Sequence, residues 1–327
     1  MYNNIKLEKG LYSITGKTFT QALAEIDPDS GYVGTELEGL DAFERQLKRF
    51  DIKISGKNSD MAEKFFNTTE SAVLFPEYVR RTIKQGIEEQ SIIGNIAAAV
   101  SYIDSIDFRA LIVTPNNTML SKIQGEEIPL GTVELDSGAT DMKKFGKGFK
   151  FTYEAIRKQR LEALGVILKR LGAQISQEIN TYVIKEIITP SNTKTLTGSS
   201  VTYNDLSEFW SSMNKFNMSV MVCSPATMAK ILSLDEMKNC NYDYLANGNI
   251  VTPFGITLVK CNGLSDTLCV GIDKSCGVEV VFGTDVIIDI DKLITSQFNE
   301  ITATIILGAI SLFDDAIKTL KTTPSTT

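Results

Sequence analysis

Apolar residues recur every three or four positions in three segments, which predicts three helices. The first covers residues 35–50, and Thr35 and Glu38 have capping-box spacing at its start. The second is the segment "VLFPEYVRRTIKQG", with Pro76 in its first turn and Gly86 as its C-terminal stop. The third is the longest; it ends before Pro190, allows an early kink, and has its apolar positions at Leu164, Leu168, Leu171, Ile175, Ile179, Val183 and Ile187.

The longest predicted helix follows a basic strand, Lys143–Tyr153. Gly165 and Gly172 lie within the helix, and each costs about 1 kcal/mol relative to alanine, so we expect another backbone to pass close to them. Gly146 and Gly148 lie in the strand, lack the spacing of a phosphate-binding loop and are followed by further extended chain. We therefore expect a bent strand there and no phosphate site.

Two segments lack a regular period. Residues 1–34 contain turn sequences such as "DPDSGYVG" and are expected to form an extended arm. Residues 114–142 mix Gly, Pro, Asn and acidic residues with short apolar pieces, over a length that compact domains rarely leave irregular. We expect this second segment to be a hairpin-like excursion that another chain covers.

Beyond the linker "PSNTKTLTGSS" the pattern changes to short alternating helices and strands. A helix is expected over 204–215 with Trp210 in the core, and "MSVMVCSP" predicts a buried strand that ends at an N-cap, Ser224. Glycine and asparagine separate four short strand-like runs: "GITLVK", "TLCVGI", "GVEVVF" and "DVIIDID". The segment "TSQFNEITATIILGAISLFDDAIKTL" predicts two further strands. The predicted fold class is therefore α+β.

Composition narrows the chemistry. The 327 residues include no histidine, which removes the usual general base and the commonest metal ligand. The net charge of −7 argues against a protein whose main affinity is for nucleic-acid phosphates. No apolar segment is long enough to span a bilayer and the start lacks a signal sequence, so we expect a soluble chain. Five cysteines without a C-x-x-C pair are expected to be buried free thiols: Cys223, Cys240, Cys261, Cys269 and Cys276.

No catalytic residue, cofactor or metal site is predicted. Pairs of acidic residues occur at Glu126-Glu127, Asp289-Asp291 and Asp314-Asp315. Such pairs leave a carboxylate-dependent soluble enzyme as the alternative from another class. Acidic residues on protein surfaces are common, however, so the pairs alone do not indicate catalysis. Ser224 lacks the G-x-S-x-G context of a nucleophile, and no histidine exists to activate it.

Over about residues 40–320 the sequence resembles the major capsid proteins of tailed bacteriophages, which share the Hong Kong 97-like fold with encapsulins. The order and spacing of three segments carry the resemblance: "DAFERQLKRFDIKISGKNSDMAEKFFNTTESAVLFPEYVRRTIKQG", "FGKGFKFTYEAIRKQRLEALGVILKRLGAQI" and "VEVVFGTDVIIDIDKLITSQFNEITATIILGAISL". The family implies a shell protein without a catalytic site, which agrees with the missing histidines.

The resemblance also implies a domain order, in which the peripheral domain is made of three separate segments. The expected order is an N-terminal arm (1–70), the first peripheral segment (71–107), an extended loop (108–150), the spine helix with the second peripheral segment (151–205), an axial domain (206–290), and the third peripheral segment with the C-terminal tail (291–327). Some relatives form a Lys–Asn cross-link, which is not predicted here.

The implied function is self-assembly through hexamers and pentamers into an icosahedral shell around double-stranded phage DNA, in the virion capsid and assembled in the host bacterial cytoplasm. Expected partners are other copies of the chain, a portal, a decoration protein and a separate scaffolding protein. This chain starts at Met1 without a long scaffolding segment, so we expect either a separate scaffolding protein or assembly without one. An encapsulin shell is the alternative within the fold. We expect charged contacts between subunits from Glu126, Glu127, Glu134, Asp136, Lys143, Lys144 and Lys147.

Overall fold

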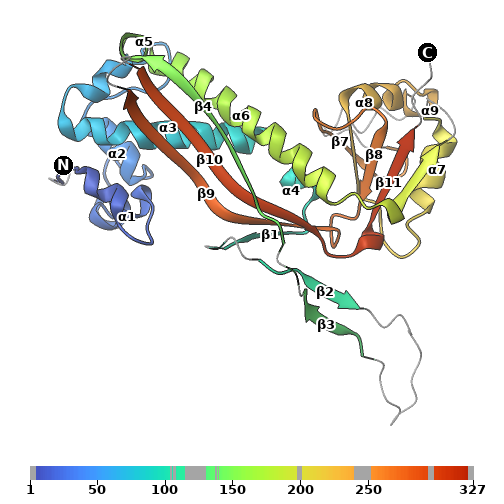
Figure 1. Cartoon of the computed structure of the whole chain (residues 1–327). Helices are drawn as coiled ribbons and strands as arrows, with labels where there is room; N and C mark the ends of the chain where they lie inside the picture. The colour runs from blue at the N-terminus through green and yellow to red at the C-terminus, as the bar shows by residue number, and fades with distance from the viewer. Residues whose placement is uncertain are drawn as a thin grey trace. The chain divides into compact units, whose positions relative to one another are not determined.

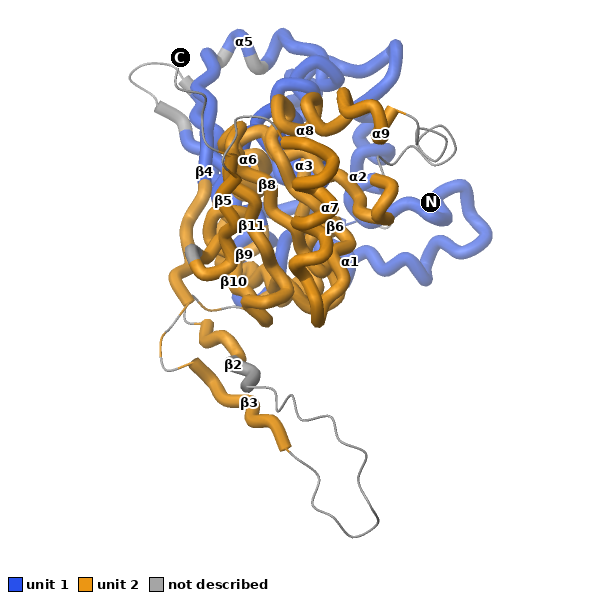
Figure 2. Tube along the Cα trace, turned by 90° about the vertical axis from the view of Figure 1, so that its right-hand side faces the viewer, with its two compact units in different colours: residues 1–89, 146–175, 286–304 blue, residues 90–145, 176–285, 305–327 orange. Residues whose placement is uncertain are grey.

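The computed structural model describes residues 5–103, 105, 108–114, 130–136, 138, 140–196, 201–238, 252–293 and 298–322. The chain divides into two compact units, each built from three segments, as Figure 2 shows. Unit 1 contains residues 1–89, 146–175 and 286–304, and unit 2 contains residues 90–145, 176–285 and 305–327.

Helices and strands are both long and numerous, which confirms the α+β class (Figure 1). The helices are α1 (Phe19–Ile26), α2 (Ala42–Arg49), α3 (Thr69–Gln90), α4 (Ile93–Ile96), α5 (Tyr153–Arg157), α6 (Leu161–Glu186), α7 (Tyr203–Ser211), α8 (Pro225–Leu232) and α9 (Asp235–Lys238). The strands are β1 (Ala99–Tyr102), β2 (Leu111–Thr114), β3 (Thr132–Leu135), β4 (Lys143–Thr152), β5 (Thr193–Leu196), β6 (Val220–Cys223), β7 (Thr257–Lys260), β8 (Leu268–Ile272), β9 (Val278–Leu293), β10 (Phe298–Ser311) and β11 (Ile317–Thr322).

The strands form three sheets, with the orders β1-β9-β10-β4, β5-β11-β8-β6-β7 and β2-β3. The sequence predicted two strands where β9 runs unbroken, because Gly283 resembles a turn residue. Instead, a Cβ at Gly283 would lie 3.0 Å from the Ser105 carbonyl oxygen, so this glycine permits close packing within a continuous strand. β5 and β11 join the sheet of β6, β7 and β8, although one precedes and the other follows the expected axial domain, residues 206–290.

In unit 1, α3 and α6 cross where each has a glycine. A Cβ at Gly172 would lie 2.1 Å from the Ile83 carbonyl oxygen, and one at Gly86 would lie 2.2 Å from that of Lys169. The close approach of another backbone is therefore confirmed at Gly172 but is wrong at Gly165, where the nearest atom to a Cβ would be the side-chain oxygen of Tyr78 (3.1 Å). The expected C-terminal stop at Gly86 is wrong, because α3 continues to Gln90; the expected place of Pro76 in the first turn is also wrong, because α3 begins at Thr69.

The predicted spine helix is two helices, α5 and α6. Residues 158–160 leave the helical path because they pair with a distant segment: the Ala62 amide donates to the Gln159 carbonyl (2.9 Å) and the Leu161 amide donates to that of Asp60 (2.8 Å). Arg160 thus forms a β-bridge with Met61 although residues 158–160 have good helix propensity, since tertiary pairing overrides a weak local preference.

Residues 5–50 are folded, so the expected extended arm over 1–34 is wrong for its described residues. They contain two 3-10 helices, Lys9–Ser13 and Asp29–Tyr32, in addition to α1 and α2. The Thr18 side chain caps α1, and Asp41 with Glu44 forms the capping box of α2. The expected box at Thr35 is also wrong, because the Thr35 hydroxyl donates to the Tyr32 carbonyl (2.7 Å).

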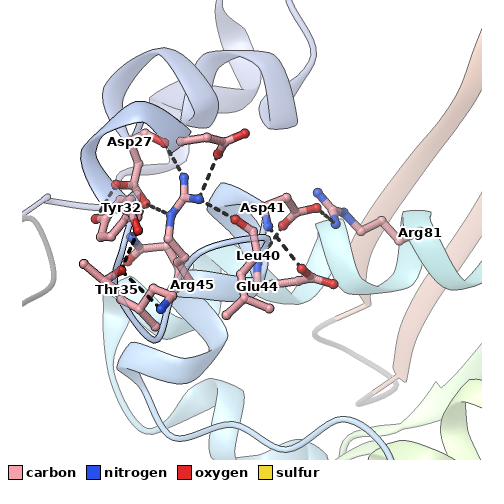
Figure 3. Close-up of polar contacts among 11 residues, drawn as sticks. Asp27, Tyr32, Thr35, Leu40, Asp41, Glu44, Arg45 and Arg81 are labelled. Atoms are coloured by element: carbon pink, nitrogen blue, oxygen red, sulfur yellow. Dashed lines mark hydrogen bonds and ion pairs between the residues drawn. The ribbon is translucent and has the colours of Figure 1, made fainter.

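A buried ion pair joins α1 to α2 (Figure 3). Arg45 is 1% exposed and its Nε lies 3.0 Å from Oδ2 of Asp27, which is fully buried. The Arg45 guanidinium also donates to Asp29 (2.8 Å) and to the carbonyls of Leu40 and Asp27, and it lies 4.4 Å above the Tyr32 ring. The hydrogen bonds of this cation therefore all go to oxygens of residues 27–40.

A second polar group links these first residues to α3. Glu77 is fully buried, and its carboxylate accepts hydrogen bonds from Thr20 Oγ1 (2.7 Å), Arg80 Nε (2.8 Å) and Arg81 Nε (2.8 Å). Arg81 also pairs with Asp41, the N-cap of α2, as Figure 3 shows. Residues 5–50 are thus held to their own chain by buried charges as well as by apolar contacts.

In unit 2, α7 and α8 pack on one face of the five-stranded sheet around Leu206, Phe209 and Ile231. Trp210 was expected in this core but is 40% exposed, where it stacks on Phe254 at a ring distance of 5.7 Å. The buried free thiols are confirmed at Cys223, Cys261 and Cys269; Cys276 is half-buried, and Cys240 lies outside the described residues. Burial raises the pKa of Cys223 to about 12, so this thiol is inert at neutral pH.

Candidate subunit interface

The β2–β3 ribbon has one apolar face. Its antiparallel register places Leu111 opposite Leu135 and residue 112 opposite Glu134. Directly opposed residues share a face and faces alternate along a strand, so Leu111, Val133 and Leu135 lie on one face, while Thr132 and Glu134 lie on the other. The alternation in "TVEL" carried this signal, but the sequence interpretation weighed only the acids of this segment.

The apolar face of the ribbon is exposed. Leu111 is 48%, Val133 62% and Leu135 67% exposed, and the nearby Leu130 is 82% exposed. The ribbon is a separate two-stranded sheet, labelled β2 and β3 in Figure 1. A two-stranded ribbon is marginally stable alone, and exposed apolar side chains of this kind are typical of a surface that binds a partner.

The four predicted acidic contact residues differ in their settings. Glu126 and Glu127 lie outside the described residues. Glu134 is exposed on the polar face of the ribbon. Asp136 is half-buried at the ribbon's base, where its Oδ1 accepts from the Gly138 amide (3.0 Å). Glu134 is therefore the freer of the two described acids.

The three predicted basic contact residues lie on β4. Lys143 already has neighbours within its own unit, since its Nζ lies 3.8 Å from Glu186 Oε2 and 4.8 Å from the centre of the Tyr182 ring. Burial, with the charges of Glu186 and Asp141, raises the pKa of Tyr182 to about 12, which keeps this phenol neutral. Lys144 and Lys147 are exposed. These two are better placed than Lys143 to reach a second copy.

The glycines of β4 have another role than the predicted bend. A Cβ at Gly146 would lie 3.0 Å from the Ala303 carbonyl oxygen, and one at Gly148 would lie 2.7 Å from that of Ile301. Both glycines thus allow β4 to approach β10, its neighbour in the sheet. Because β4 is an edge strand, its exposed lysines also hinder unwanted pairing with another edge.

Ser224 is a helix cap, as predicted. Its Oγ accepts from the Thr227 amide (3.2 Å) and donates to Asp266 Oδ1 (2.6 Å) at the start of α8. Asp289, Asp291, Asp314 and Asp315 are exposed, and Asp315 pairs with Lys318.

Among the described residues there is neither a group of three or more metal-binding side chains nor a helix long and apolar enough to cross a membrane.

A family model identifies relatives of this chain. The family model described as "Phage capsid protein" matches residues 138–304, just over half of the chain. No curated protein matches the sequence.

Solved structures share the fold at low sequence identity. A virus-like particle from Pyrococcus furiosus has 15% identity and a TM-score of 0.53, with 75% of this chain and 98% of that chain covered. A chain of Gordonia phage Cozz has 14% identity and a TM-score of 0.53 (72% and 87% covered). The capsid of an empty GTA particle has 9% identity and a TM-score of 0.54 (71% and 90% covered).

The family match spans the basic strand β4, the long helix α6, all of β9 and the first half of β10. The structural likenesses extend the shared fold over about three quarters of the chain. The encapsulin alternative shares this fold but has no support from the family model. The chain therefore belongs to the phage capsid protein family, as a major capsid protein with the Hong Kong 97-like fold.

Proposed function

We propose that copies of this chain assemble through hexamers and pentamers into the icosahedral shell that encloses the double-stranded DNA of a tailed phage, with the apolar face of the β2–β3 ribbon packed on an adjacent subunit. The exposed side chains of Leu111, Val133 and Leu135 carry the proposal. Fully burying such a side chain contributes about 1.5–3 kcal/mol, so the ribbon offers a substantial share of an obligate contact.

A matched pair of variants on β3 tests this role. Val133→Glu places a charge on the apolar face, whereas Thr132→Glu places the same charge on the opposite face, one residue away. Both side chains are exposed in the subunit, so both variants should fold as the wild type does. Purified proteins are compared by circular dichroism and by negative-stain electron microscopy.

We expect shells from the wild type and Thr132→Glu, and unassembled subunits from Val133→Glu, because a charge buried in an apolar contact is costly. Normal shells from Val133→Glu would contradict the role of the ribbon face. Loss of shells in both variants would mean that the ribbon contributes to assembly but that its apolar face is not specifically the contact surface.

Charged contacts set the register of neighbouring subunits in this proposal. Lys144 and Lys147 are the donors, with Glu134 and the loop acids Glu126 and Glu127 as acceptors, while Lys143 and Asp136 act mainly within their own subunit. Exposed pairs contribute about 0–1 kcal/mol each. Lys144→Glu combined with Lys147→Glu should slow assembly or make it irregular, with subunit folding unchanged; normal shells at low salt would refute the charge role.

The shell encloses DNA without sequence-specific binding, which suits a chain of net charge −7. The role of the chain is structural and not catalytic.

The shell is assembled in the host cytoplasm with a portal, a separate scaffolding protein and a decoration protein as partners. Co-expression with each neighbouring gene product, followed by isolation of shells, identifies these partners. An encapsulin would instead enclose a protein cargo, which mass spectrometry of purified shells detects.

A further inference from the structure

Unit 2 has a hollow lined by hydroxyl groups and one lysine. It lies at the ends of β5, β11 and β8, strands that Figure 2 shows side by side. Its volume is about 570 Å³ and its lining residues are Ile188, Thr193, Thr195, Ser265, Thr267, Leu268 and Lys321. The register places Lys321 opposite Thr195 on one side and opposite Leu268 on the other, so all three stand in one row across the sheet.

The charge of Lys321 is uncompensated. None of the described lining residues is acidic, and no ion pair among the described residues includes this exposed lysine. Its neighbours differ: Lys194 Nζ lies 2.7 Å from Glu208, and Lys318 Nζ lies 3.3 Å from Asp315. An unpaired lysine beside several hydroxyl groups offers an anion both a positive charge and hydrogen-bond donors.

Hydroxyl donors gather around the same row. The oxygens of Ser265 and Thr267 lie 2.9 Å apart and share one hydrogen bond, which leaves one of their two protons available. The Thr195 side chain is exposed. Thr319 is fully buried, and its hydroxyl has no hydrogen-bond partner among the described residues.

Thr319 lies on the same face of β11 as Lys321 and in register with Thr193 of the hollow. Thr319 does not itself line the hollow, but its buried hydroxyl has no acceptor among the described residues, which is costly.

We propose that this hollow binds a small oxyanion, phosphate or a carboxylate, between the Lys321 ammonium and the hydroxyls of Thr195, Ser265 and Thr267. The bound anion neutralises the charge of Lys321 and accepts hydrogen bonds from the hydroxyl groups. The methyl groups of the threonines and the Leu268 side chain surround it. The anion thereby ties the end of β11 to β5 and β8. This site needs no second subunit, so it stands independently of the shell proposal.

Titration of the full-length, unassembled protein tests the site. Inorganic phosphate is added at constant ionic strength and binding is followed by ³¹P NMR. Lys321→Met removes the charge and keeps most of the stem, Thr195→Val removes one hydroxyl, and Lys194→Met is the matched control on the other face of β5. Circular dichroism checks that each variant folds. If Lys321→Met does not fold, the phosphate affinity of Thr195→Val relative to the wild type tests the site instead.

We expect saturable binding by the wild type and by Lys194→Met, an affinity about tenfold lower in Lys321→Met, and a smaller loss in Thr195→Val. A parallel titration with propionate identifies the source, because tighter binding of propionate assigns the hollow to a carboxylate and tighter binding of phosphate assigns it to the free ion. Absence of saturation in the wild type, or equal losses in Lys194→Met and Lys321→Met, would overturn the proposal.

Discussion

The sequence suggested that an arm over residues 1–34 and an excursion over residues 114–142 both contact neighbouring subunits, yet residues 5–50 and the β2–β3 ribbon differ in what their side chains contact. Residues 5–50 have Arg45 and Asp27 buried against each other and reach Glu77 of α3 through Thr20. The ribbon instead exposes Leu111, Val133 and Leu135. An irregular sequence therefore does not identify an assembly element; apolar side chains without an intramolecular cover do.

The largest expected effect comes from breaking the buried pair. Arg45→Met leaves the carboxylate of Asp27 without its cation in a fully buried position, so we expect the free energy of unfolding to fall by about 3–5 kcal/mol. Urea unfolding of unassembled subunits measures it. Lys17→Met, which removes an exposed pair with Glu25, is the control and should cost less than about 1 kcal/mol. A similarly small loss for Arg45→Met would mean that the Arg45–Asp27 pair contributes little to holding residues 5–50 in place.

Glu77→Gln should have the next largest effect, about 1.5–3 kcal/mol at neutral pH, because hydrogen bonds from two arginines to a carboxylate lose their charge. Burial alone would raise the pKa of Glu77, but the hydrogen bond and charge of Arg80, with the hydrogen bonds of Arg81 and Thr20, lower it overall.

This lowered pKa gives a pH test. Stability from ionised Glu77 is present above its unfolded pKa of about 4.3 and is lost as the pH falls through the folded value. The wild type should therefore lose more stability on acidification than Glu77→Gln does, as measured by urea unfolding at pH 7 and in acid. Equal losses would exclude Glu77 as the responsible group.

The smallest expected effect on the isolated subunit is that of Leu135→Ser, within about 0.5 kcal/mol, because this side chain is already exposed. The same substitution should impair assembly. Thermal unfolding of the subunit and electron microscopy of the assembly reaction separate the two effects. A loss above about 1 kcal/mol in the subunit would show that the ribbon already packs on its own chain, and the contrast with residues 5–50 would fail.

Sequence reasoning succeeded where one local pattern dominates. The apolar period of α6, the basic strand β4 and the Ser224 cap all follow from neighbouring residues. The close approach at Gly172 was also predictable, because glycine within a strongly periodic helix needs a packing reason.

Failures arose where two local signals competed. Thr35-x-x-Glu38 and Asp41-x-x-Glu44 are equivalent capping boxes in sequence, and the structure uses the second. The contacts of Arg45, one turn into α2, with Asp27 fix the chain ahead of Asp41, and no local pattern encodes that pairing. The β-bridge of Met61 with Arg160 likewise interrupts a helix that residues 158–160 would otherwise continue.

At the interface, sequence reasoning located the basic strand and the excursion but emphasised charges. The apolar face of the ribbon was readable from alternation in "TVEL", whereas its pairing with Leu111 required the register. The hollow around Lys321 could not be anticipated, because it depends on parallel pairing between β5 and β11, which lie far apart in the sequence.

The stacking of Trp210 on Phe254 gives the chain a spectroscopic consequence. Trp210 is the single tryptophan of the sequence and belongs to unit 2. Its emission therefore reports the melting of that unit, while far-ultraviolet circular dichroism reports helices in both. Coincident curves in Arg45→Met would demonstrate that a lesion in unit 1 unfolds the chain cooperatively, and separated curves would demonstrate two independent transitions.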